Sequence, residues 1–180
     1  MIEPSSKLNA LNIINFVVNF LGKITMSFKN KTLPALLTAS ISAIIFSSTA
    51  QAAACSIDVE VSAGMVYSAK NIDVPKSCKD FTINLNAAGT MPKAVMGHNL
   101  VVSKEADQKA VIDDGSKAGL PANYVKAKDA RVLLATTIIG GGEKTSAKLD
   151  VKKLNAKDKY TFYCTFPGHA MMMKGTLKLV

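Results

Sequence analysis

The sequence predicts an all-β protein folded as a β-sandwich, with a short helix and loop inserted around 104–130. Apolar and polar side chains alternate with a period of two in several short segments, which is typical of strands with one buried face and one face in water. Glycines and prolines, as at 92–93 and 140–142, separate these segments as turns. About seven or eight strands at this spacing favour two packed sheets. The sequence contains no internal repeat and no sign of a second domain.

The strands can be placed in chain order. The alternation is clearest in five segments, which are 57–61, 81–85, 147–151, 160–164 and 177–179. Two further hydrophobic segments, 98–103 and 131–139, are additional strand candidates. Residues 104–130 differ because they are polar, contain several alanines and lysines, and carry Pro121 in their middle. We expect them to form a short helix and a loop that pack outside the sheets.

The N-terminal part of the chain has the pattern of an export signal. A short basic region is followed by an apolar run at 33–49 and by the A-x-A cleavage pattern at 50–52. A proline and several serines interrupt this run, whereas a membrane-spanning helix needs roughly 20 mostly apolar residues. Residues 26–52 therefore predict a signal peptide that is cleaved after Ala52. Residues 1–25 precede a second methionine and are interpreted as an over-extended start without an assigned function.

The charge of the chain does not favour nucleic acid as a partner. The formal net charge is +9 at pH 7, and this positive balance favours acidic partners. However, the lysines are scattered along the chain and form no basic block.

The chain has three cysteines, which allow one disulfide and leave one thiol. Export into an oxidising compartment favours a structural disulfide. Pairing Cys55 with Cys78 would tie the first strand to the turn before the strand-like FTINLN, and we favour this pairing. A lipid attached to Cys55 is an alternative, but the three alanines before Cys55 lack the leucine that such sites usually carry. Lipid attachment would also leave Cys78 without a partner.

The stretch YTFYCTFPGHAMMMKG, residues 160–175, gathers several potential metal ligands. Cys164 precedes His169 by five residues, and Met173 follows His169 by four. The only other histidine in the chain is His98. Two imidazoles, one thiolate and a weak thioether form the ligand set of blue-copper centres, whereas zinc prefers a fourth strong ligand. A buried structural cysteine is one alternative. A catalytic cysteine with a histidine base is another, but it needs an orienting group and a cleft that the sequence does not specify.

These motifs resemble those of the azurin family, which are bacterial blue-copper proteins of the cupredoxin class. The resemblance lies in Cys55, Cys78, VMGHN around His98, IIGGGEK at 138–144, and CTFPGH followed by a methionine and KGTL. It covers 53–180 without an obvious gap. The spacing C-x4-H-x3-M is particular to azurins, because other cupredoxins such as plastocyanin and pseudoazurin space these ligands differently. The resemblance implies a Greek-key, cupredoxin-like β-sandwich and a copper-binding domain over 53–180.

The resemblance also implies a set of copper ligands, carried over position by position. His98 and His169 would supply imidazole nitrogens, and Cys164 would supply the thiolate. Met173 would be a long axial ligand, and the carbonyl oxygen of Gly97 would approach weakly from the opposite side.

Further residues around the ligands follow from the same resemblance. Asn99 would tie the two ligand loops together and hydrogen-bond near the cysteine sulfur. An apolar electron-transfer patch would surround the exposed edge of His169, and its members would be Met65, Met91, Val95, Met96, Phe166, Pro167, Met171 and Met172. Ser116 and Lys117 would make the rim of this patch more polar.

The function implied is that of a periplasmic type 1 copper protein, which holds one copper per chain and passes single electrons. It would act as a carrier and not as an enzyme. Its partners would be redox proteins that dock transiently, such as c-type cytochromes or a periplasmic reductase or dehydrogenase, with no nucleic acid and no membrane span in the mature form. A periplasmic copper-binding or delivery protein with the same donors is the alternative. A copper nitrite reductase would need a second copper, for which the two histidines leave no ligands.

Overall fold

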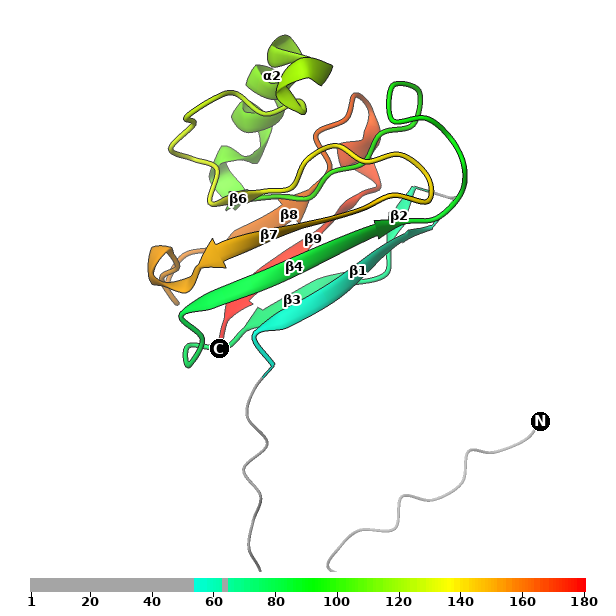
Figure 1. Cartoon of the computed structure of the whole chain (residues 1–180). Helices are drawn as coiled ribbons and strands as arrows, with labels where there is room; N and C mark the ends of the chain where they lie inside the picture. The colour runs from blue at the N-terminus through cyan, green and yellow to red at the C-terminus, as the bar shows by residue number, and fades with distance from the viewer. Residues whose placement is uncertain (1–53, 63–64) are drawn as a thin grey trace, which may run out of the picture. The chain divides into compact units, whose positions relative to one another are not determined.

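The computed structural model describes residues 54–62 and 65–180 (Figure 1). The predicted over-extended start at 1–25 and the predicted signal peptide at 26–52 lie outside the described residues. In the part of the chain that is described, no helix is both long and apolar enough to cross a membrane.

The described residues form two β-sheets. The first sheet has the strand order β2-β1-β4-β7, with β1 at Ser56–Ser62, β2 at Val66–Tyr67, β4 at Asp80–Ala87 and β7 at Lys144–Asp150. The second has the order β3-β9-β8-β5-β6, with β3 at Asn71–Val74, β5 at Val101–Lys104, β6 at Leu134–Ala135, β8 at Tyr160–Tyr163 and β9 at Lys174–Leu179. The pairs β1–β4 and β3–β9 are parallel, and the other pairs are antiparallel.

The two sheets share one hydrophobic core. Val59, Ile83 and Leu85 of the first sheet and Phe162 and Leu177 of the second belong to the same cluster, and each is at most 1% exposed. Along β4, buried residues alternate with exposed or half-buried ones, as expected for a strand with one face in the core. Burying a large apolar side chain of this kind stabilises the fold by about 1.5–3 kcal/mol. The predicted β-sandwich is confirmed.

The segment predicted as a helix and loop contains α2 at Gln108–Ala118, flanked by short helices η1 at Glu105–Asp107 and η2 at Leu120–Ala122. Figure 1 shows α2 outside the two sheets. Its Val111 packs with Val101 and Tyr163, on the outer face of the second sheet. Tyr163, on this outer face, is therefore buried. All four residues of β8 are buried, although the sequence predicted one exposed face for this strand.

Two of the predicted strands are shorter than expected. Of 98–103 only the second half is a strand, and of 131–139 only Leu134–Ala135 is one. His98 pairs with Ile139 in an isolated bridge, while the Leu100 amide donates to the Thr136 hydroxyl and not to a backbone carbonyl. Side-chain acceptors therefore interrupt the ladder between these two segments, and hydrophobicity alone does not reveal such an interruption.

A disulfide links Cys55 to Cys78, which is the pairing favoured from the sequence. Cys55 directly precedes β1 and Cys78 stands shortly before β4, its parallel neighbour. Because β4 spans 8 residues at roughly 3.3 Å each, the loops that follow β4 lie roughly 25 Å from the disulfide.

Candidate metal centre

Three of the predicted ligands come together in the structure. One ligand atom from each of His98, Cys164 and His169 lies within 4.8 Å of the others. The Cys164 Sγ is 3.8 Å from His169 Nδ1, and the two imidazole ring centroids are 5.1 Å apart. All three residues are buried, at 4%, 0% and 7% exposure in chain order.

The loop from Cys164 to Met173 is closed on itself. Cys164 directly follows β8, and its amide donates to the carbonyl of Met173 at 3.0 Å. The Met173 amide in turn donates to the carbonyl of His169 at 2.8 Å. Gly168, with φ of +81°, makes the left-handed turn that starts the short helix η4 at His169–Met171. These hydrogen bonds hold the two ends of the loop together and fix the main chain of His169 relative to Cys164 and Met173.

His98 is positioned by its bridge to Ile139 and by the glycine before it. The His98 amide donates to the Ile139 carbonyl at 2.9 Å, and the Ile139 amide returns a bond of the same length. A Cβ on Gly97 would lie 2.5 Å from the Lys93 carbonyl oxygen and 2.9 Å from side-chain carbons of Ile138 and Phe166. Only glycine therefore allows the main chain to pass this closely beside His98.

Asn99 joins the two ligand segments through its side chain. Its Oδ1 accepts from the Thr165 amide at 2.9 Å, and its Nδ2 donates to the Thr165 hydroxyl at 2.8 Å and to the Asn123 carbonyl at 2.9 Å. The Asn123 Oδ1 accepts from the Ile138 amide at 2.9 Å. Thr165 and Asn123 were not identified from the sequence, and no local pattern singles them out because their bonds span distant parts of the chain.

Burial leaves the three candidate ligands uncharged near neutral pH. Burial, together with the smaller effect of the nearby His169, lowers the pKa of His98 to about 4. Burial also lowers the pKa of His169 and raises that of the Cys164 thiol to about 11. Hydrogen bonds from the main chain of Asn99 and Phe166 and from the Tyr67 hydroxyl oppose the shift at Cys164, because they stabilise a thiolate. The imidazoles thus offer free lone pairs, and only the thiol has to lose a proton before it binds a metal.

One atom of this cluster indicates directly that a cation belongs here. His98 Nδ1 is, among the described residues, the only buried side-chain nitrogen or oxygen without a hydrogen-bond partner. Leaving such an atom unpaired costs about 1–3 kcal/mol. A metal ion bound between the three donors would satisfy it. Two imidazoles and one thiolate suit copper better than zinc, because this cluster of described residues contains no carboxylate or fourth strong ligand.

The structure separates the three consecutive methionines. Met173 is fully buried at the base of the loop, whereas Met171 is 82% exposed and Met172 54% exposed. This arrangement is compatible with Met173 as the axial ligand and leaves the other two on the surface. The roles of Met173 and of the Gly97 carbonyl stay predictions.

The residues predicted to form the electron-transfer patch are all exposed or half-buried. Met91, Val95, Pro167, Met171 and Met172 are exposed, and Met65, Met96 and Phe166 are half-buried. A groove of about 450 Å³ runs between the ligand loop and α2, and its lining includes Phe166, Pro167, Ala170 and Met171 together with Gln108, Lys109, Ile112, Ser116 and Lys174. The contribution of α2 through Ile112 was not predicted, whereas Ser116 was expected at the rim of the patch and does line this groove.

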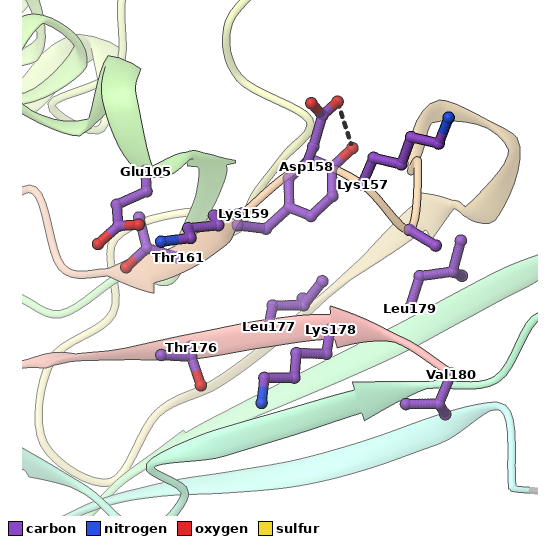
Figure 2. A pocket seen from close by; sticks show the side chains of 12 residues that line it. Glu105, Lys157, Asp158, Lys159, Thr161, Thr176, Leu177, Lys178, Leu179 and Val180 are labelled. Atoms are coloured by element: carbon purple, nitrogen blue, oxygen red, sulfur yellow. Dashed lines mark hydrogen bonds between the residues drawn. The ribbon is translucent and has the colours of Figure 1, made fainter.

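A second hollow, of about 610 Å³, contains none of the candidate ligands. It lies along β9 and the start of β8 (Figure 2). Lys157 and Lys178 point away from each other there, and the Tyr160 hydroxyl donates to the Asp158 carboxylate at 3.3 Å. Its polar side chains do not converge on a common point, so we assign the function to the histidine–cysteine cluster.

The fold and the cluster define a class: β-sandwich proteins that hold one soft metal ion between two histidines and a cysteine. A family model described as copper binding proteins, plastocyanin/azurin family, matches residues 53–180. An azurin from Bordetella pertussis is 53% identical over 135 residues, which are 75% of this chain and 90% of that protein. An azurin from Alcaligenes faecalis is 52% identical over 126 residues, 70% of this chain and 98% of that protein.

A solved structure gives the same result. An azurin from Methylomonas sp. strain J is 48% identical, and it aligns with a TM-score of 0.69 over 71% of this chain and 99% of its own. The chain therefore belongs to the plastocyanin/azurin family of copper-binding proteins. The resemblance noted in the sequence is confirmed at the level of the family.

Proposed function

We propose that the chain is an exported type 1 copper protein that transfers single electrons between redox partners. Its copper would be held by the imidazoles of His98 and His169 and the thiolate of Cys164, with the Met173 thioether and the Gly97 carbonyl as weaker ligands. The observation that carries the proposal is the buried cluster of three donors, in which His98 Nδ1 has no other partner.

A copper ion held by these residues supplies a centre that accepts and releases one electron by cycling between Cu(II) and Cu(I). The protein contributes a fixed set of donors. Asn99 holds the His98 and Cys164 segments together, and the amides of Cys164 and Met173 close the ligand loop. Because these bonds do not involve the metal, the donors can keep their positions when the charge of the site changes. Little reorganisation is then needed in each transfer.

His169 is the proposed electron port. It stands in the loop next to the electron-transfer patch, and its ring lies 4.6 Å from the Phe166 ring, centroid to centroid. Phe166 lines the groove beside α2. An apolar surface next to a ligand suits brief docking of a redox protein such as a c-type cytochrome or a periplasmic reductase, since such redox contacts are small.

Copper delivery by the same site is the second candidate, and an enzymatic role is a third. A delivery protein has to release its metal readily, whereas the three donors here are at most 7% exposed. This burial favours retention of copper and hence electron transfer. Among the described residues a single group of histidines and cysteines could hold a metal, which favours a carrier over a multicopper enzyme.

The proposed location is the periplasm, reached through the predicted signal peptide at 26–52 with cleavage after Ala52. The Cys55–Cys78 disulfide supports an oxidising compartment. N-terminal sequencing of the protein recovered from a periplasmic extract would test the cleavage position.

The copper site is tested by the visible spectrum of the protein purified from the periplasm without added metal. We expect an intense thiolate-to-copper band and one copper per chain. Cys164→Ser should abolish this band, because a hydroxyl cannot supply sulfur-to-copper charge transfer. The fold should survive, because the disulfide does not involve Cys164. A Cys164→Ser protein that stays blue would refute the assignment.

A further inference from the structure

All methionines of the predicted mature chain belong either to the electron-transfer patch or to the candidate ligand set. The chain has 8 methionines, of which only Met1 and Met26 precede residue 53. The others are Met65, Met91, Met96, Met171, Met172 and Met173. Among the described residues, the buried core is built mainly from valine, leucine and isoleucine, and Met173 is its only methionine. Thioether groups are therefore concentrated in the part of the domain where a redox partner would dock.

These methionines differ widely in their exposure to solvent. Met171 is 82% exposed, Met172 is 54% exposed and Met91 is 47% exposed, whereas Met173 is fully buried. A methionine with most of its surface in water leaves its sulfur open to small solutes. The two consecutive methionines of the ligand loop are thus accessible to reagents that do not reach Met173, the residue that follows them.

Met171 and Met172 stand beside the proposed electron port. Met171 ends η4, which begins at His169, and the Met172 amide donates to the His169 carbonyl at 3.0 Å. Met171 also lines the groove between the ligand loop and α2, together with Phe166. The ligand loop thus holds the main chain of both methionines, while their side chains are exposed. A chemical change at these side chains would alter the docking surface and leave the main-chain hydrogen bonds of the loop intact.

We propose that Met171 and Met172 are sites of reversible oxidation by peroxides, and that this oxidation weakens docking at the electron-transfer patch. The inference rests on the proposed function, because it concerns the surface where redox partners would bind. The thioether sulfur attacks one oxygen of hydrogen peroxide, the O–O bond breaks, and a sulfoxide and one water molecule are formed. The sulfur loses two electrons and the peroxide gains them, so no further reactant is needed.

Oxidation changes the character of the patch because a sulfoxide is polar, whereas a thioether is apolar. In a docked complex the sulfoxide oxygen would lose its water and face an apolar surface without a hydrogen-bond partner, which is unfavourable. Met173 is protected by its burial, so the candidate ligands should stay unmodified. Oxidation would then act on docking and not on the metal site, and methionine sulfoxide reductases could reverse it.

The test exposes the copper-loaded, oxidised protein to hydrogen peroxide, removes the excess with catalase and maps the modified residues by peptide mass spectrometry. We expect Met171 and Met172 to gain one oxygen each, and Met173 none. The thiolate-to-copper band should keep its position and intensity. Electron self-exchange between two copies, measured by NMR, should become about tenfold slower or more, because each docked pair would bury sulfoxides from both molecules. Methionine sulfoxide reductases should restore the original rate.

Met171→Leu/Met172→Leu provides the decisive variant, since leucine keeps the surface apolar and has no sulfur to oxidise. Met91→Leu is the matched control, because it removes the other exposed methionine of the patch. For each protein the rate after peroxide is compared with its own rate before treatment. We expect peroxide to slow self-exchange in the parent and in Met91→Leu, and to leave the rate of the double variant unchanged.

Three results would overturn the proposal. Met173 could be oxidised before Met171 and Met172, the treated parent could exchange electrons as fast as the untreated one, or the double variant could slow as much as the parent. An untreated parent without a thiolate-to-copper band or measurable self-exchange would instead overturn the proposed copper function. The untreated parent therefore separates a failure of the proposed function from a failure of the oxidation proposal.

Discussion

A buried thiol and two buried imidazoles can lie this close together because none of them carries a charge near neutral pH. Burial lowers the pKa of His98 to about 4, lowers that of His169, and raises that of Cys164 to about 11. Charging any of these groups in an apolar setting would be costly. In the metal-free site the two imidazole nitrogens can therefore bind a metal ion without losing a proton. The Cys164 sulfur can bind it only after the thiol has lost its proton.

Copper binding at pH 7 should accordingly release about one proton per ion, and this proton should come from Cys164. The thiol is protonated in the metal-free protein and ionised in the complex, while both imidazoles are neutral before and after binding. The apparent affinity should therefore rise about tenfold per pH unit from about pH 7 to 10, and level off above the pKa of the thiol. Calorimetric titration in two buffers with different ionisation enthalpies measures the number of protons.

Cys164→Ser provides the control for this titration, since any metal it still binds should release no proton. Release of two protons per copper by the parent at pH 7 would show that an imidazole is charged in the metal-free site. Release of none would show that Cys164 is already a thiolate. Either result would contradict the prediction.

The sequence could predict the ligand residues of this site but not the hydrogen bonds that hold them. Cysteine and histidine are rare in this chain, so Cys164 and His169 within one short stretch indicated a metal site. The hydrogen bonds around them were not predictable, because Tyr67 and Asn99 are 32 positions apart and Asn99 and Thr165 are 66 apart. Such partners are fixed by the packing of the sheets and leave no local pattern.

At the scale of elements, the insertion that carries α2 supports the ligand loop. Tyr124 follows η2, and its ring meets that of Phe166 edge-on at 5.3 Å between centroids. The neighbouring Asn123 bonds to Asn99 through its carbonyl. The position of this segment depends on a close contact with the helix, because a Cβ on Gly115 would lie 2.1 Å from the Tyr124 carbonyl oxygen.

Gly115→Ala should therefore destabilise the insertion, although alanine is the better helix former. The propensity gain is about 0.5–1 kcal/mol. Overpacking costs about 1–3 kcal/mol, and here the obstacle is main chain that cannot rotate aside. We expect faster hydrogen exchange of the α2 amides and unchanged protection in β4. Ser116→Ala, at an exposed position on the same helix, is the control and should leave the exchange of α2 as slow as in the parent.

The sequence predicted elements well where one face of a strand alone meets the core, as in β1 and β4. The prediction failed where a helix covers the outer face of a strand, or where a side chain replaces the hydrogen-bond acceptor of a neighbouring strand. The alternation expected in β8 is absent because α2 covers the outer face of Tyr163. The strand expected at 131–139 is reduced to Leu134–Ala135 because side chains such as Thr136 and Asn123 accept bonds that a neighbouring strand would otherwise accept.

At the scale of the whole domain, the disulfide and the proposed metal site lie at opposite ends of the β-sandwich. The disulfide joins the starts of two parallel strands, β1 and β4. The proposed ligands stand in loops at the opposite end of β4 and after β8. The core between these ends contains side chains from both sheets. Stability and copper chemistry should therefore respond separately to changes at the disulfide.

Replacing both Cys55 and Cys78 with serine tests this separation. The bridge closes a loop between residues 23 positions apart. In the chain-entropy description, its loss should lower the free energy of unfolding by about 3 kcal/mol, within the usual range of about 2–4 kcal/mol. The visible spectrum and reduction potential of the copper-loaded variant should match those of the parent. Substitution is preferable to a thiol reductant, which would compete with Cys164 for copper. A folded variant with a shifted band would show that the disulfide end is coupled to the metal site through the core.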